Sequence, residues 1–314
     1  MNYKNRNILV FFILLLIFMK APAQNNAIQG INDTTIKMLF SGGKNKALII
    51  SMDDGVNTDR KLVQLLNKYN IKGTFHLNSG NLGKENYLSK EEVKSLLKNH
   101  EVSVHSANHP NLTLLPKAGI RQEVQDDRKE LERLTGCIVN GMAYPFGNYN
   151  DSVIDVLMEC GIVYARTVEE SYNFSIPVNF LRWAPTIHQF KNAFLKPGDT
   201  TNNKKELAIF YTTINNFLAA DTLSLLDIWG HSWENTREGN DWHETEYFLK
   251  LVANNPAILY TTQIDLVNYI NAYNALIYSE NKTNASNLSI IDVFIKRGNK
   301  TFKIKAGKTV KLEY

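Results

Sequence analysis

The stretch ALIISMDDG, residues 47–55, joins a short apolar run to two adjacent carboxylates and a glycine. A short apolar run bounded by turn residues is typical of a buried strand, so we expect Asp53 and Asp54 to follow the carboxyl end of that strand. A similar pattern lies downstream, where VSV at 102–104 leads into HSANH at 105–109. Two carboxylates and two imidazoles at strand ends are typical of a metal-dependent hydrolase.

Strand-like and helix-like patterns alternate from Lys46 to about Tyr273. The strand-like runs cover residues 47–51, 71–77, 102–104, 138–143, 162–166, 223–229 and 257–261. The helix-like patterns begin at Asn57 or Thr58 and at Ser89, and cover 120–134, 153–159, 246–253 and 264–273. Repeated strand–helix units imply an α/β fold with a parallel sheet, closed as a barrel or open.

The amino terminus carries the pattern of a secretory signal peptide. Lys4 and Arg6 precede an apolar run at residues 8–19 that is short for a membrane span, and APA at 21–23 supplies a cleavage pattern. We therefore expect a signal peptide at 1–23, export to the periplasm or the extracellular space, and a mature chain without stable membrane insertion. An uncleaved anchor is the alternative.

Composition limits the classes of partner. The 314-residue chain has a formal charge of +4, but three cations lie in the predicted signal peptide, which leaves about +1. This nearly neutral balance gives no electrostatic reason to expect nucleic acid. The hydrophobic content of 44% suffices for a core, so we expect one large domain at 24–280 and a small appendage at 281–314.

Two further features concern the appendage and the cysteines. Residues 282–287 read as a polar linker, and residues 291–312 alternate around a turn at 297–300, which is the pattern of a small β-hairpin. Two cysteines exclude a disulfide-built scaffold. Cys137 and Cys160 either pair in an oxidising compartment or remain as buried thiols.

The candidate chemical groups all follow predicted strands, where barrel enzymes place their catalytic groups. Pro110 disfavours helix at His109, so the two histidines of HSANH span a loop. One carboxylate oxygen and two imidazole nitrogens make three protein ligands and leave positions for water and substrate, as catalytic zinc requires. The candidates are Asp53 and Asp54, His105 and His109, residues 144–147, and His231.

These residues resemble the polysaccharide deacetylases, also called nodulation-type deacetylases or family 4 carbohydrate esterases, over roughly 46–273. The family's Asp-Asp pair holds a general base and a metal ligand, which the resemblance assigns to Asp53 and Asp54. Its His-Ser/Thr-x-x-His motif supplies two more ligands and matches His105 and His109. DIWGH at 227–231 resembles the last motif, whose histidine, here His231, is the general acid.

The resemblance implies an irregular (β/α) barrel that removes acetyl groups from a carbohydrate and releases acetate. An acetylated oligo- or polysaccharide is the expected partner, with an N-acetyl amino sugar favoured. The expected cofactor is one divalent ion, zinc first, with cobalt or nickel as alternatives. The rival functions are an O-acetyl glycan esterase and a degenerate carbohydrate-binding protein without turnover.

The chain departs from the family pattern in two motifs. The third motif commonly reads Arg-x-Pro-Tyr, but AYPF at 143–146 lacks the arginine, so another group must hold Asp53. The fourth motif usually supplies an aspartate behind the acid histidine and a tryptophan wall, and only RW at 182–183 resembles it. His76 lies within strand-like sequence, so we expect it to have a structural role. The candidate substrate contacts are Tyr144, Pro145, Phe146, Trp183, His188, Trp229 and Trp233.

Overall fold

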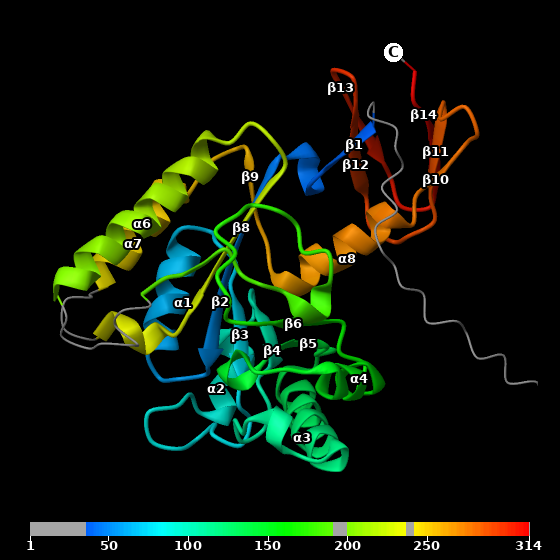
Figure 1. Cartoon of the computed structure of the whole chain (residues 1–314). Helices are drawn as coiled ribbons and strands as arrows, with labels where there is room; N and C mark the ends of the chain where they lie inside the picture. The colour runs from blue at the N-terminus through cyan, green and yellow to red at the C-terminus, as the bar shows by residue number, and fades with distance from the viewer. Residues whose placement is uncertain (1–35, 191–199, 237–241, 314) are drawn as a thin grey trace, which may run out of the picture. The chain divides into compact units, whose positions relative to one another are not determined.

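The computed structural model describes residues 36–190, 200–236 and 242–313 (Figure 1). The predicted signal peptide at 1–23 lies outside these residues. All described elements belong to one compact unit, Asn32–Tyr314. Within the described parts of the chain, no helix has the length and apolar character to cross a membrane.

A parallel sheet curls into the predicted irregular barrel at the centre of the fold. Its strand order is β6-β5-β4-β3-β2-β8-β7, and β9 also pairs with β2. Each of the seven predicted strands is present with shifted ends, and β7 is an additional strand that was not predicted. The strands are β2 (Lys46–Asp54), β3 (Thr74–Leu77), β4 (Glu101–Val104), β5 (Gly141–Ala143), β6 (Tyr164–Arg166), β7 (Ile187–His188), β8 (Ser224–Gly230) and β9 (Ile258–Tyr260).

The seam between β6 and β8 is closed by a short irregular segment. Trp183 exchanges backbone hydrogen bonds with Ala165 and Thr167 beside β6. Three residues later, the N–H of Thr186 donates to the carbonyl of Asp227 in β8. Because this segment forms hydrogen bonds to both β6 and β8, the carboxyl ends of these two strands lie near the carboxyl end of β2, which carries Asp53 and Asp54.

Helices cover the outside of the sheet, and their ends follow local sequence signals. Ser89 and Glu92 form the predicted capping box at α2, with N–H to side-chain oxygen distances of 2.6 and 3.3 Å. Gly136 ends α3 in the left-handed conformation. The helices are α1 (Asp59–Lys68), α2 (Lys90–Leu96), α3 (Lys117–Thr135), α4 (Asp151–Glu159), α6 (Thr200–Ala219), α7 (Trp242–Val252) and α8 (Gln263–Asn274).

Some elements were not predicted from the sequence. Helix α6 lies where no element was assigned, since its apolar residues do not recur with a clear helical period. The short 3₁₀ helices are η1 (Ser41–Gly43), η2 (Leu112–Leu114), η3 (Pro145–Gly147), η4 (Phe180–Arg182) and η5 (Ser232–Thr236). Two of them, η3 and η5, follow β5 and β8 and carry side chains of the site described below.

Helix α8 begins at the amino-terminal ends of β3 and β4. The Thr74 hydroxyl and the Ile264 N–H donate to Glu101 Oε2 at 2.9 and 3.0 Å, and the Tyr164 hydroxyl donates to Oε1 at 2.6 Å. Burial raises the pKa of Glu101 to about 7, although the three hydrogen-bond donors lower it. The buried carboxyl therefore anchors the start of α8 to the sheet.

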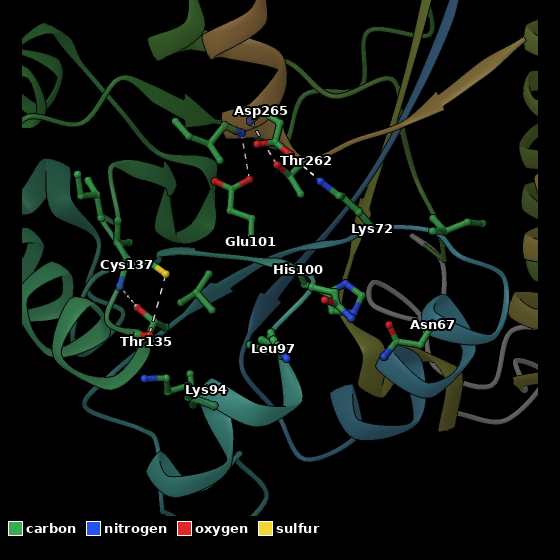
Figure 2. Close-up of a pocket in the computed structure, with 18 of the residues that line it drawn as sticks. Asn67, Lys72, Lys94, Leu97, His100, Glu101, Thr135, Cys137, Thr262 and Asp265 are labelled. Carbon is green, nitrogen blue, oxygen red and sulfur yellow. Dashed lines mark hydrogen bonds and ion pairs between the residues drawn. The ribbon is translucent and has the colours of Figure 1, made fainter. Parts of the chain in front are cut away.

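The two cysteines are both free thiols. Cys137 is exposed at a pocket of about 780 Å³ that Glu101 and His100 also line, as Figure 2 shows, whereas Cys160 is buried. Of the two alternatives, unpaired thiols are therefore confirmed. The prediction that both thiols are buried is wrong for Cys137. Cys160 ends α4 on its core side, while Cys137 lies before β5 begins.

The chain ends in two three-stranded antiparallel sheets, which together we call the C-terminal β-module. One has the order β1-β12-β13 and the other β10-β11-β14. Their strands are β1 (Ile36–Leu39), β10 (Ile277–Tyr278), β11 (Asn284–Asn287), β12 (Val293–Arg297), β13 (Lys300–Ile304) and β14 (Lys308–Lys311). The turn predicted at 297–300 joins β12 to β13.

The C-terminal β-module differs from the predicted linker and hairpin tail. The stretch predicted as a linker contains β11, and β1, from before the barrel, pairs with β12 along its whole length. Val293, Ile295 and Ile304 are fully buried, in one cluster with the buried Ala272 of α8 and Leu276, which follows α8. A lone hairpin cannot bury such a face. The second sheet and α8 supply the missing cover, so residues 281–314 do not form a separate unit.

Candidate active site

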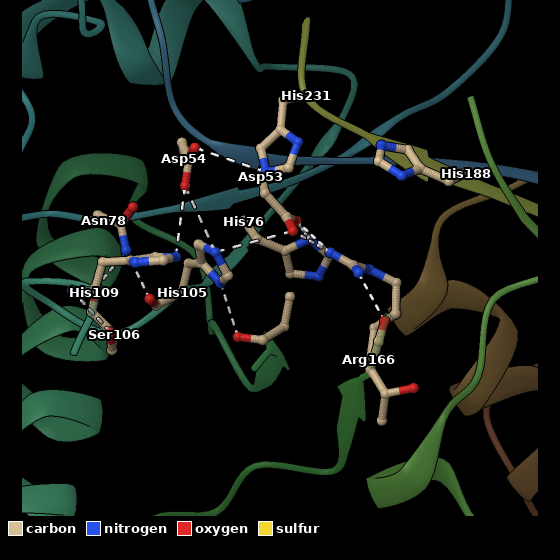
Figure 3. A network of polar contacts seen from close by, with 12 residues as sticks. Asp53, Asp54, His76, Asn78, His105, Ser106, His109, Arg166, His188 and His231 are labelled. Carbon is tan, nitrogen blue, oxygen red and sulfur yellow. Dashed lines mark hydrogen bonds and ion pairs between the residues drawn. The ribbon is translucent and has the colours of Figure 1, made fainter. Parts of the chain in front are cut away.

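The five residues predicted to carry the chemistry lie together at the carboxyl ends of β2, β4 and β8 (Figure 3). Asp54 Oδ1 lies 3.6 Å from His105 Nε2 and 3.9 Å from His109 Nε2. The other oxygen of Asp54 lies 3.8 Å from His231 Nε2. Donor atoms of Asp54, His105 and His109 all lie within 4.8 Å of one another, so one ion is able to reach all three.

The backbone is bent to aim these side chains at one point. Asp54, Ser106 and His109 have positive φ angles of 80°, 63° and 58°, a region that side chains other than glycine occupy at a cost in free energy. The amide of Asn78 donates to the carbonyls of His105 and Ser106 at 2.6 and 2.9 Å. These hydrogen bonds hold the loop in the bent conformation.

His105 is oriented as a metal ligand. Its Nδ1 donates to the carbonyl of Ala143 at 2.8 Å, which leaves the lone pair on Nε2 facing Asp54. Burial lowers the pKa of His105 to about 4, so the ring is neutral, as a ligand must be. Buried Asp127 of α3 accepts the N–H groups of Ser79 and His105 at 2.7 and 2.9 Å and fixes the loop. This donor set fits a divalent transition-metal ion.

Asp53 lies beside that ligand set and is held by Arg166 and His76 (Figure 3). The buried Arg166 guanidinium donates through one nitrogen to both carboxylate oxygens, and His76 Nδ1 lies 3.2 Å from Oδ1. Burial raises the pKa of Asp53, but the charges of Arg166 and then His105 lower it. The lowering effects outweigh burial, so the pKa of Asp53 lies well below its ordinary value. Asp53 is therefore an ionised, fixed carboxylate 3.9 Å from His105 Nε2.

Two partners of Asp53 were missed from the sequence. Arg166, the last residue of β6, holds Asp53 in place of the arginine that the family motif would put at position 143 in β5. A charged residue closing a buried strand at the catalytic edge was the available signal. His76 was assigned a structural role because it lies within a strand, yet its ring faces Asp53.

His231 is paired with a buried carboxylate three residues later. Its Nδ1 lies 2.8 Å from Glu234 Oε1, which also lies 2.9 Å from His188 Nε2. Burial lowers the pKa of His231, but Glu234, then Asp54, raise it more strongly, to about 9. Glu234 thus occupies the place behind the predicted acid histidine, His231, for which the sequence offered no aspartate.

The predicted substrate contacts divide into two groups. Phe146 is 60% exposed, and its ring centroid lies 4.6 Å from that of His109. Trp233 is partly exposed, with its ring 5.2 Å from that of His231. These two aromatic side chains flank the ligand set. The buried Trp229 lies behind it, between the guanidinium of Arg166 at 4.7 Å and the stacked ring of His188 at 4.2 Å.

Besides Trp229, four of the predicted substrate contacts are buried and need correction. Trp183 is fully buried beside Tyr164 and fills the core where the barrel seam closes. The Tyr144 hydroxyl donates to a backbone carbonyl at 2.9 Å. Pro145 and His188 are also buried, and His188 binds Glu234. These side chains build the walls of the barrel, so they are unavailable for direct contact with a sugar.

Comparisons with known proteins agree with this arrangement. Residues 41–165 match the family model of polysaccharide deacetylases. An uncharacterised protein of Bacillus subtilis is 24% identical over 196 residues, which cover 60% of each chain. The poly-beta-1,6-N-acetyl-D-glucosamine N-deacetylase of Staphylococcus aureus is 29% identical over 121 residues, which cover 34% of this chain and 42% of that one.

These matches cover less than two thirds of either relative's length. Among solved structures, a Mycobacterium smegmatis protein that carries the name of a polysaccharide deacetylase has 16% identity and a TM-score of 0.58. That match covers 74% of this chain and 93% of the other, and it shows a shared fold. Residues 41–165, which carry the Asp-Asp pair and the His-x-x-x-His loop at one barrel edge, thus form a polysaccharide deacetylase-like domain.

Proposed function

We propose that this protein is a metal-dependent hydrolase that removes acetyl groups from a carbohydrate and releases acetate. One observation carries the proposal: an arginine-held carboxylate, Asp53, and a glutamate-held imidazole, His231, both adjoin the ligand set of Asp54, His105 and His109. A divalent ion held by that set would polarise the acetyl carbonyl and acidify a water molecule.

The side chains divide the proton transfers between them. Asp53, kept ionised and oriented by Arg166, accepts a proton from the water that attacks the acetyl carbon. His231, kept protonated by Glu234, donates a proton to the departing amine nitrogen. The backbone N–H of Phe146, in the turn beside His109, is our candidate donor to the oxyanion.

The substrate proposal is an N-acetyl amino sugar polymer. The Staphylococcus aureus relative is named for a substrate of this class. The exposed rings of Phe146 and Trp233 support it as well, because the flat apolar faces of sugars pack on aromatic rings. Zinc suits the mixed oxygen and nitrogen ligands, with cobalt or nickel as alternatives. The predicted signal peptide supports a periplasmic or extracellular location.

A substrate panel tests this proposal directly. The chain from Gln24 is stripped of metal, reconstituted with zinc, cobalt or nickel, and assayed for acetate release. We expect metal-dependent release from N-acetylglucosamine oligomers. Release from acetylated xylan alone would support the O-acetyl esterase. Glycan binding without any acetate would support the degenerate binding protein.

Replacing His231 with alanine is expected to slow release from an N-acetyl sugar far more than release from an aryl acetate. An amine leaving group needs a proton in the transition state, whereas a phenolate departs unaided. The measurement is kcat/KM on both substrates for the variant and the wild type. Equal losses would assign His231 to supporting the ligand set instead of to acid catalysis.

Replacing Glu234 with glutamine is expected to move the alkaline limb of the pH–rate profile to lower pH. Activity requires protonated His231 and is lost as pH rises through its pKa, which Glu234 raises. Removing that charge lowers the pKa, so the loss begins earlier. The pH profile of kcat/KM checks this, with Glu91→Gln on the exposed surface of α2 as the control. An unshifted limb would show that Glu234 does not tune the acid.

A further inference from the structure

The positive charge of this chain is concentrated at its carboxyl-terminal end. Residues 281–314 contain eight lysines and arginines but two acidic residues, a formal charge of +6, whereas the whole chain carries +4. Two of the lysines pair with acidic neighbours, Lys303 with Asp292 and Lys311 with Glu313. The exposed lysines of the C-terminal β-module are Lys37, Lys296, Lys300, Lys303, Lys305, Lys308 and Lys311.

One face of the module brings like charges together. Lys37 of β1 and Lys296 of β12 are directly opposite in the antiparallel register, and both are exposed. Lys303 of β13 is opposite Phe294 and lies on the same face by strand alternation. Like charges directly opposite destabilise a sheet. An anionic partner at this face removes that cost.

Two neighbouring loops at one end of the module combine charge with exposed apolar side chains. The Ala306 N–H donates to Asp292 Oδ1 at 2.9 Å, so the loop 288–292 lies against the turn after β13. The first loop exposes 73% of Leu288 and 95% of Ile290. The second carries Lys305 and Lys308. We call residues 288–292 and 305–308 the lysine-rimmed loop pair.

We propose that the lysine-rimmed loop pair docks on an anionic lipid surface. Leu288 and Ile290 enter the boundary between headgroups and acyl chains, and Lys305 and Lys308 contact the lipid phosphates. Reversible binding of this kind combines buried apolar area with attraction between lysines and anionic headgroups. The inference does not depend on the proposed catalytic function.

The exposed aliphatic side chains favour lipid over other polyanions. Charge alone suits an acidic glycan or a nucleic acid equally well. Sugars and unpaired bases, however, stack on aromatic rings, and the tips of this loop pair carry leucine and isoleucine. Burial of these side chains among acyl chains gains free energy that a polar polymer does not provide.

The lysine-rimmed loop pair belongs to elements other than those that carry the candidate active site. The C-terminal β-module packs against α8, and its strand β1 leads into the amino-terminal end of β2, whereas the candidate catalytic side chains of Asp53 and Asp54 lie at the carboxyl end of β2. Figure 1 shows the arrowhead of β2 pointing away from the two antiparallel sheets.

Vesicle sedimentation tests the proposal. The chain from Gln24 contains the whole compact unit Asn32–Tyr314 and excludes the apolar run of the predicted signal peptide. We expect it to sediment with vesicles of phosphatidylcholine and phosphatidylglycerol, less with phosphatidylcholine alone, and less at high salt. The double variant Lys305→Gln, Lys308→Gln should lower partitioning about 25-fold, since each lysine contributes roughly a factor of five.

A second pair of variants separates apolar insertion from charge. Leu288→Ser with Ile290→Ser should weaken binding at both salt concentrations, while Ile138→Ser with Val178→Ser, at equally exposed sites elsewhere, should leave it unchanged. Absent binding, equal binding to both vesicle types, or equal effects of the two serine pairs would overturn the proposal. So would light scattering that shows a dimer dispersed by Leu288→Ser with Ile290→Ser, since a second copy would then cover the loops.

Discussion

Asp53→Asn is expected to lower kcat for acetate release by about 10²–10⁴-fold, the usual contribution of a general base, with the bound metal unchanged. The amide keeps the shape of the carboxylate but cannot accept a proton from water. Asp53 lies beside the ligand set of Asp54, His105 and His109 and is not needed to complete it. Acetate release and metal content, measured on the same sample, check both halves of this expectation.

The control separates a proton acceptor from a merely placed side chain. Arg166→Lys keeps a positive charge beside Asp53 but removes the planar guanidinium, so the carboxylate remains ionised and is less well oriented. We expect a smaller loss of kcat for this variant than for Asp53→Asn. Wild-type turnover in Asp53→Asn would eliminate the base role.

His109→Ala is expected to abolish stoichiometric metal binding and, with it, activity on every substrate. Three protein ligands are the usual complement of a catalytic zinc site, and two do not hold the ion at that affinity. His109 is the better target of the two histidines because its side chain is 25% exposed, against 2% for His105. Its removal therefore leaves a smaller cavity in the core.

Metal analysis after dialysis measures this outcome, with circular dichroism to show that the variant folds. His243→Ala, on the exposed surface of α7, is the matched control and should bind metal like the wild type. Full metal content in His109→Ala would mean that the ion lies elsewhere. The cluster of His188, His231 and Glu234, whose donor atoms also lie close together, would then be the place to look.

The barrel and most of its strands were predictable because their signals are local. The apolar run before Asp53, the capping box at Ser89 and the glycine after α3 each act through neighbours in the chain. Glu234 was within reach of the same reasoning, since it lies only three residues after His231. What the sequence could not supply was the direction in which each side chain points.

The C-terminal β-module shows why the domain boundary predicted at residue 281 from local composition differs from the structure. The polar stretch after Asn281 contains β11, whose buried Ala285 and Asn287 alternate with more exposed residues. The partner of β12 on one side is β1, which lies more than two hundred residues earlier in the chain. Local composition describes only neighbouring residues, whereas strand pairing depends on which apolar faces are buried against each other in the folded chain.

The sequence by itself determined the strand–helix alternation, the parallel sheet and the residue types of the ligand set, because these depend on local pattern and spacing. Tertiary structure alone decided that Arg166, 113 residues from Asp53, orients that carboxylate. It also decided that Trp183 and Tyr144 belong to the core, and that Phe146 and Trp233 remain open to a ligand. The reason is that burial and charge pairing depend on which chain segments meet when the sheet curls and closes.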